Sequence, residues 1–227
     1  MDLVLLLQVL PLAIGAAISP TVLTIQILLM SGGPGGLGKA WGLAVGRTAA
    51  LIVISVGGVG LLNRLPDVST GQPSLSEGVI VLVAGIVLGL MAVKEWRAPR
   101  NPDHHSRIVA RLSRIHPVLL VVVGFGWELV SVSTLALFIP ALHLISNAAA
   151  PDAVKLVAVI ELIAIASLTW VGPPLAVTLY GERARRSLDR IHSWVSAHEH
   201  QITLTVTIVF GAALLCWGAL ITAQNWP

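Results

Sequence analysis

The chain has 227 residues, of which 56% are hydrophobic and only 11% are charged, and its formal net charge is +3. Ordinary soluble domains carry roughly 25% charged residues, so this composition excludes a soluble globular fold, which could not hide so much apolar surface. The single cysteine, Cys216, also excludes an intramolecular disulfide and a CxxC redox pair.

Long apolar stretches, each with at most one charge in its interior, alternate with short charged segments. A membrane span needs about 20 mainly apolar residues, so the pattern predicts an all-α integral membrane protein with six transmembrane helices. These are expected near residues 3–30, 40–62, 76–94, 117–146, 153–179 and 202–223. The first stretch does not resemble a cleaved signal peptide, because it lacks a preceding basic segment and is too long.

The first expected helix is too long for a straight span, since its residues would extend about 42 Å against a hydrocarbon core of about 30 Å. Pro20 removes a backbone hydrogen bond and clashes with the preceding turn, so we expect a break there. Ser19, Thr21 and Thr24 are close enough in sequence to bond the freed carbonyl. A broken helix offers backbone groups to a substrate; the alternative is a simple structural kink.

Two features follow Pro20 in the sequence. Gln26 lies two turns further on and is expected to line the same pathway. Gly32, Gly33 and Pro34 are expected to form a hinge or a tight turn, because the segment lacks the Gly-Lys-Ser/Thr ending and the preceding strand of a phosphate-binding loop.

Three ionisable residues lie inside expected spans, namely Arg47, Glu128 and Glu161. A charge at membrane depth costs roughly 2.5–3.5 kcal/mol on insertion scales, so these side chains should face the bundle interior and pair, Arg47 with Glu128 or with Glu161. They would contact a substrate head group or carry coupling protons; the alternative is a structural ion pair. His143 is a lesser candidate, expected near the outer end of its helix, where a histidine would be solvated.

The loop histidines do not have the spacing of a defined metal site, although Asp103-His104-His105 and His198-Glu199-His200 contain potential ligands. The sequence contains nothing that resembles a Ser-His-Asp set, a zinc-hydrolase helix or a nucleotide pocket. We therefore expect no enzyme activity, no catalytic residue, no bound metal and no cofactor.

The basic residues gather in three loops on one side of the expected membrane. Eleven of the 14 lie there: Lys39, Lys94, Arg97, Arg100, Arg107, Arg111, Arg114, Arg183, Arg185, Arg186 and Arg190. The opposite side keeps only Arg64 and Lys155. The positive-inside rule then places the basic loops in the cytoplasm of a plasma-membrane protein and both termini outside. This distribution argues against nucleic-acid binding.

Residues 103–116 combine an apolar face, formed by Ile108, Leu112 and Ile115, with arginines around the other face. We expect a basic amphipathic helix on the inner leaflet, where it would recruit an anionic lipid or simply anchor the topology. The segment from Gly181 to Trp194 repeats this pattern.

Two halves of the chain share a weak pattern, since the segment from Pro11 to Pro34 and the segment from Pro117 to Pro140 both begin with proline and carry a glycine soon after. An odd number of spans in each half would make a repeat inverted, as in many transporters. We therefore predict a first three-helix repeat over 1–102, a cytoplasmic amphipathic linker over 103–116 and a second three-helix repeat over 117–227.

The segments PLAIGAAISPTVLTIQILLMSGG (11–33) and GKAWGLAVGRTAALIV (38–53), with the last third of the chain (161–221), resemble the GAP/Sap group. These are actinobacterial glycopeptidolipid- and sulfolipid-addressing proteins of the LysE exporter superfamily. The resemblance implies a six-helix exporter of two inverted repeats, with Pro20 at the superfamily proline. The matching element of the second half commonly reads Asn-Pro, whereas here it reads Trp127-Glu128-Leu129.

Three functions follow from these observations. The first is export of a cell-envelope lipid or lipid-linked cargo, with membrane lipid as partner. The second is export of a small metabolite, an amino acid or a metal cation. The third is a non-transporting scaffold for lipid-synthesis or transport proteins, and a homodimer is a further expectation.

Overall fold

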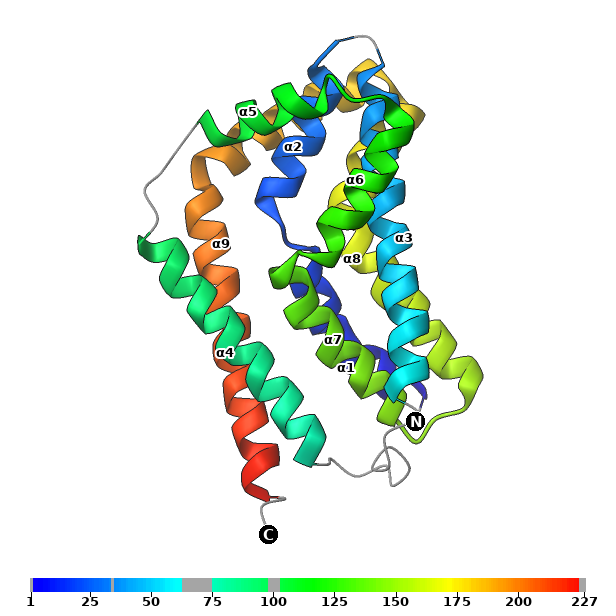
Figure 1. Cartoon of the computed structure of the whole chain (residues 1–227), viewed down its shortest axis with the longest axis vertical. Helices are drawn as coiled ribbons and strands as arrows, with labels where there is room; N and C mark the ends of the chain where they lie inside the picture. The colour runs from blue at the N-terminus through cyan, green and yellow to red at the C-terminus, as the bar shows by residue number, and fades with distance from the viewer. Residues whose placement is uncertain (1, 34, 63–74, 98–102, 225–227) are drawn as a thin grey trace.

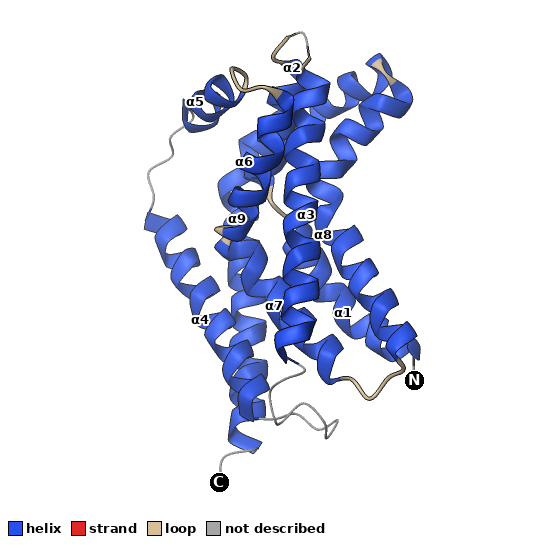
Figure 2. Cartoon of the chain, turned by 45° about the vertical axis from the view of Figure 1, so that its right-hand side comes forward, coloured by secondary structure: helices blue, strands red, loops and turns tan. Residues whose placement is uncertain are grey.

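The computed structural model describes residues 2–33, 35–62, 75–97 and 103–224. All regular structure in this part of the chain is helical (Figure 2), which agrees with the predicted class. The helices are α1 (Asp2–Ala17), α2 (Pro20–Ser31), α3 (Gly36–Leu62), α4 (Leu75–Arg97), α5 (Asp103–Leu112), α6 (Pro117–Leu129), α7 (Val132–Asn147), α8 (Asp152–Tyr180) and α9 (Glu182–Gln224).

Four helices, α3, α4, α8 and α9, are long and apolar enough to cross a membrane. The pair α1 and α2 and the pair α6 and α7 also pass this test together, which gives six spans if each bent pair is one span. The chain is therefore a multi-pass membrane protein with four to six candidate spans. Six spans, the two repeats and their boundaries stay predictions.

The helical break expected at Pro20 is present. α1 ends at Ala17 and α2 begins at Pro20, with an angle of 56° between them. A residue before proline is pushed away from helical geometry, and Ser19 has φ −135° and ψ 89°. Proline is well tolerated at the first position of a helix, so it begins α2. The carbonyl of Ala17, at the end of α1, accepts a hydrogen bond from the Thr169 hydroxyl of α8.

A second break divides the helix expected over 117–146, which was predicted as one piece. α6 and α7 meet at 69° around Val130 and Ser131. No proline is needed, because Val130, Ser131 and Val132 are consecutive weak helix formers. The last turn of α6 tightens, with the amide of Ser131 donating to the carbonyl of Glu128 at 3.1 Å. The Ser131 and Thr134 hydroxyls then hydrogen-bond each other at 3.0 Å.

The sixth expected helix was placed too late in the chain. α9 begins at Glu182 instead of 202 and runs for 43 residues, because the basic segment after Gly181 contains no proline and continues directly into the apolar span. Gly181 itself has a φ of +57°, in the left-handed region that favours glycine, and it separates α8 from α9.

The amphipathic helix predicted over 103–116 is present as α5, which lies across one end of the molecule (Figure 1). Its apolar face packs against protein. Leu112 is buried in a cluster with Ile25 and Leu29 of α2, and Ile108 and Ile115 pack against the same cluster. Arg111 and Arg114 are exposed, so the helix covers α2 with one face and presents charge on the other.

Two helix pairs pack through glycine. A Cβ atom added to Gly42 or Gly46 of α3 would overlap the backbone of α6, and one added to Gly124 of α6 would overlap the backbone of α3. Small residues let membrane helices approach closely. The α4–α9 pair uses the same device, since a Cβ on Gly218 would lie 2.6 Å from the Leu82 amide nitrogen. α4 and the later part of α9 stand beside the other helices (Figure 1).

Both chain ends lie at one end of the molecule, whereas α5 and the α8–α9 junction lie at the opposite end (Figure 1). The basic residues that the structure describes in these two segments therefore lie at the end away from the termini, and the side of the membrane that this end faces stays a prediction. Arg64 and Arg100, and the side chain of Arg107, lie outside the described residues.

Candidate functional site

A buried ion pair joins α3 to α6. Arg47 Nη2 lies 2.5 Å from Glu128 Oε2, and the two side chains are 1% and 0% exposed. The glycine contacts between these helices bring the two backbones close enough for the pair to form. The sequence left Glu128 and Glu161 as possible partners of Arg47, and in the structure the partner is Glu128. The pair holds the last turn of α6 against α3, directly before the second helix break.

Aromatic rings surround the Arg47 guanidinium. Its Cζ lies 4.4 Å from the centroid of the Trp170 ring and 6.0 Å from that of Trp127. Trp170 on α8 is fully buried and donates its indole N–H to the Thr48 hydroxyl at 3.1 Å. A cation over a desolvated tryptophan face is stabilised by about 2 kcal/mol. Arg47 is therefore held from three helices, α3, α6 and α8.

Gln26 extends this network to α2. Its amide nitrogen donates to the Trp170 carbonyl at 3.0 Å and to the Ala40 carbonyl at 3.3 Å, and the residue is fully buried. It is not among the residues that line the pocket at Pro20. Gln26 therefore ties α2 to α3 and α8, and its place in a substrate pathway stays a prediction.

We expect Trp170→Leu to lower the free energy of unfolding by about 2 kcal/mol, because it removes the aromatic face under Arg47. Trp170→Phe keeps an aromatic face and loses the bond to Thr48, so it should cost about 1 kcal/mol. Denaturant titration of the purified protein in mixed micelles measures both values. The 76% exposed Trp96 supplies the control, since Trp96→Leu should leave stability almost unchanged. Equal losses for the two Trp170 variants would contradict a role for the ring.

A pocket of about 210 Å³ lies between the first helix break and the start of α7, the helix that follows the second break. Five of its lining residues carry hydroxyl groups and one carries a carboxylate; we call this the hydroxyl pocket. Its polar residues are Ser19, Thr21, Glu95, Ser133, Thr203 and Thr207. They come from the first break, from α4, from the start of α7 and from α9. Pro20 also lines the pocket, so it is the predicted pathway residue that the structure places at a cavity.

Two carboxylates, Glu95 in the hydroxyl pocket and Glu199 beside it, already have partners. The Thr21 hydroxyl donates to Glu199 Oε1 at 2.7 Å, which links the first turn of α2 to α9. Glu95 Oε1 lies 3.5 Å from His200 Nδ1, which links α4 to α9. These contacts hold α9 against both neighbours beside the first break.

The remaining predicted residues lie elsewhere. Glu161 on α8 is half-buried, and within the described ranges its Oε2 atom has no hydrogen-bond partner and no ion pair joins it to Arg47. His143 is 1% exposed, which is contrary to the expected solvated position, and its Nδ1 pairs with Asn147 Nδ2 at 2.9 Å. Gly32 and Gly33 form a turn after α2, whereas Pro34 lies outside the described residues. Their functional roles stay predictions.

An all-helical membrane protein with two interrupted helices and a polar pocket between them is the class that this geometry defines. Within that class, the chain belongs to the Sap family, the sulfolipid-1-addressing proteins, whose family model matches residues 9–219. This confirms the resemblance to the GAP/Sap group. Comparisons with curated proteins and with solved structures give no match.

Proposed function

We propose that this protein exports a lipid or lipid-linked component of the cell envelope across the plasma membrane. The observation that carries the proposal is the hydroxyl pocket, which lies between the break before Pro20 and the start of α7, the helix that follows the second break. Interrupted helices with polar surroundings are how many transporters bind their substrates. The family is named for a sulfolipid-addressing protein, which points to envelope lipid as the class of cargo.

The proposal includes an architecture and an orientation. Six spans would form two inverted three-helix repeats, with the two bent pairs in corresponding positions. The basic segments at α5 and at the start of α9 would lie in the cytoplasm and both termini outside. Membrane lipid would be the partner, a homodimer or an assembly with lipid-synthesis proteins would complete the system, and no catalytic step would be needed.

Two measurements test the function together. Envelope lipids extracted from cells with and without the gene should differ by a lipid missing from the cell surface. Purified protein in liposomes should move that lipid between leaflets. A strain that is instead sensitive to an added amino acid or metal would support export of small solutes, and a surface lipid that is lost although the protein moves nothing in liposomes would support a scaffold.

The break at Pro20 gives a sharper test. We expect Pro20→Ala to slow lipid transport by about tenfold, a barrier change of about 1.4 kcal/mol, because the new amide can close the gap between α1 and α2. Pro11 is the matched control, since it is exposed and lies inside the continuous helix α1. Pro11→Ala should transport normally. Unchanged transport in Pro20→Ala liposomes would show that the proline break is not needed.

A further inference from the structure

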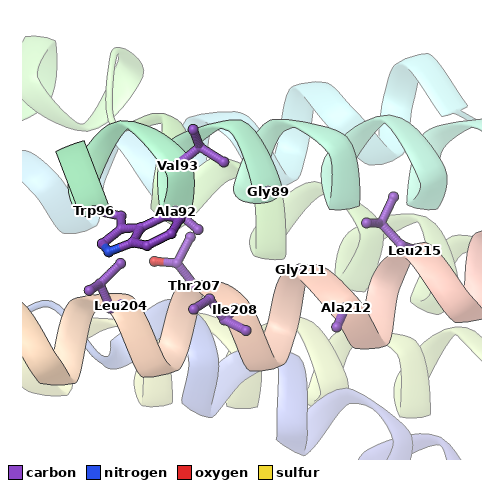
Figure 3. A pocket seen from close by; sticks show the side chains of 10 residues that line it. All are labelled: Gly89, Ala92, Val93, Trp96, Leu204, Thr207, Ile208, Gly211, Ala212 and Leu215. Carbon is purple, nitrogen blue, oxygen red and sulfur yellow. The ribbon is translucent and has the colours of Figure 1, made fainter.

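The hydroxyl pocket adjoins an apolar groove between α4 and α9. The groove has a volume of about 510 Å³, within the roughly 300–1,000 Å³ of common ligand sites. It is lined from α4 by Gly89, Ala92, Val93 and Trp96, and from α9 by Leu204, Thr207, Ile208, Gly211, Ala212 and Leu215. We call it the α4–α9 groove. Figure 3 shows Trp96 lying at one end beside Leu204, with Thr207 between the two helices.

The groove and the hydroxyl pocket meet at Thr207, which lines both cavities. A lipid-facing groove alone indicates no specific ligand, because any membrane lipid can cover it. Here the outer cavity is apolar and exposes Trp96 and Ile208, whereas the inner one carries five hydroxyl groups and the Glu95 carboxylate among apolar side chains. A molecule with an acyl chain and a polar head matches both cavities at once.

The chemistry of the hydroxyl pocket limits which kind of lipid head group can bind there. Among the residues that the structure describes, no lysine or arginine lines the pocket. Proteins recognise sulfate and phosphate mainly through arginine and lysine, and an anion beside Glu95 would meet like charge, which costs several kcal/mol. Hydroxyl and carboxylate groups instead hydrogen-bond the hydroxyls of an uncharged sugar.

The first turn of α2 also faces this pocket, and a helix N-terminus carries a partial positive charge that favours anions. That partial charge is already offset by a carboxylate of the protein, because Glu199 of α9 accepts a hydrogen bond from the Thr21 hydroxyl within this turn. Glu95 adds a second carboxylate on α4. The N-terminus of α2 therefore does not make the pocket selective for an anionic ligand.

We propose, building on the export function proposed above, that the hydroxyl pocket binds the uncharged, hydroxyl-rich head of a glycolipid while the α4–α9 groove holds one of its acyl chains. The cargo at this site would carry no sulfate or phosphate on the part of the head that enters the pocket. A sulfate or phosphate group would be carried on a part of the lipid that does not enter the pocket, or it would be attached to the lipid after export.

Photocrosslinking tests this site with the full chain in phosphatidylcholine nanodiscs. The probe is a glucosyl diacylglycerol with a diazirine in one acyl chain, and mass spectrometry locates the labelled peptides. Labels should fall on 89–96 and 204–215. About a tenfold excess of unlabelled glucosyl diacylglycerol should lower labelling about tenfold, because it competes for the same site with similar affinity, whereas the same excess of phosphatidylglycerol or free glucose should not. Equal competition by phosphatidylglycerol would overturn the head-group assignment.

Two neighbouring alanines on α9 provide a matched pair. Both are exposed, but Ala212 lines the groove and Ala213 lines none of the described cavities. Ala212→Trp should lower labelling about tenfold, whereas Ala213→Trp should label like the natural protein. Glu95→Lys should let phosphatidylglycerol compete, because it reverses the charge at the pocket.

The outcomes separate this site from the export function. Equal labelling of Ala212→Trp and Ala213→Trp would contradict the assignment of the α4–α9 groove as the acyl-chain site. If Ala212→Trp loses labelling but still transports lipid normally, the site is not the transport site and the export function stands. If the natural protein labels as expected but moves no lipid, the export function fails and the binding site stands.

Discussion

Replacing Arg47 by methionine is expected to lower the free energy of unfolding by about 3–5 kcal/mol, the cost of leaving a buried charge without its partner. Glu128 is fully buried and its only ion pair among the described residues is with Arg47. Glu128→Leu should lower the free energy of unfolding by a similar amount, because it leaves the buried Arg47 guanidinium between α3, α6 and α8 without its carboxylate partner. Denaturant titration in mixed micelles measures each loss.

The double variant Arg47→Met, Glu128→Leu is the control for this prediction. It removes both charges and keeps similar volumes, so it should be clearly more stable than either single variant. A double variant as unstable as the sum of the single ones would show that the ion pair does not couple the two residues. That result would contradict the contact itself.

The same variants decide between the functional and structural interpretations of the pair. If the double variant folds and still transports lipid, the pair only holds α6 against α3. If it folds but transports nothing, the charges take part in transport. The exchanged pair Arg47→Glu, Glu128→Arg adds a stricter test, since recovery of both folding and transport would exclude a role that depends on which helix carries which charge.

Much of this fold follows from the sequence, because apolar stretches of spanning length and the break at Pro20 have local causes. The second break was not predicted, since no proline marks it. It lies at three residues of modest helix propensity, Val130, Ser131 and Val132, directly after the turn that carries the Arg47–Glu128 pair. α9 was placed too late for a related reason, because hydropathy finds only its apolar part.

The candidate site was harder to predict. The spanning helices are apolar on nearly all faces, so periodicity does not show which side of a helix is buried. The sequence therefore left Glu128 and Glu161 equal as partners of Arg47, and it gave no signal for Trp170, which packs on Arg47 from far along the chain. The hydroxyl pocket draws on four helices, α2, α4, α7 and α9, and on the break before Pro20, and hydroxyl side chains are common in ordinary membrane helices. The spacing of Gly42 and Gly46 was a further signal for the α3–α6 contact.

The second large effect on stability is expected at Gly46, in the contact between α3 and α6. Gly46→Ala should lower the free energy of unfolding by about 3 kcal/mol, at the upper end of the cost of overpacking, because its Cβ would overlap the Val121 carbonyl on the α6 backbone. A flexible side chain can move aside, but two helix backbones must separate. Arg47 directly follows Gly46, so separation would also stretch its ion pair with Glu128.

Gly57 is the matched control on the same helix. It is exposed, and a Cβ atom there would meet nothing within 4 Å. Gly57→Ala should stabilise the protein by about 0.5–1 kcal/mol, because alanine loses less backbone entropy in a helix than glycine. Opposite signs for the two substitutions would show that close backbone approach, and not helix propensity, determines the α3–α6 contact. If Gly46→Ala were also stabilising, α3 and α6 could not lie as close as the Arg47–Glu128 pair requires.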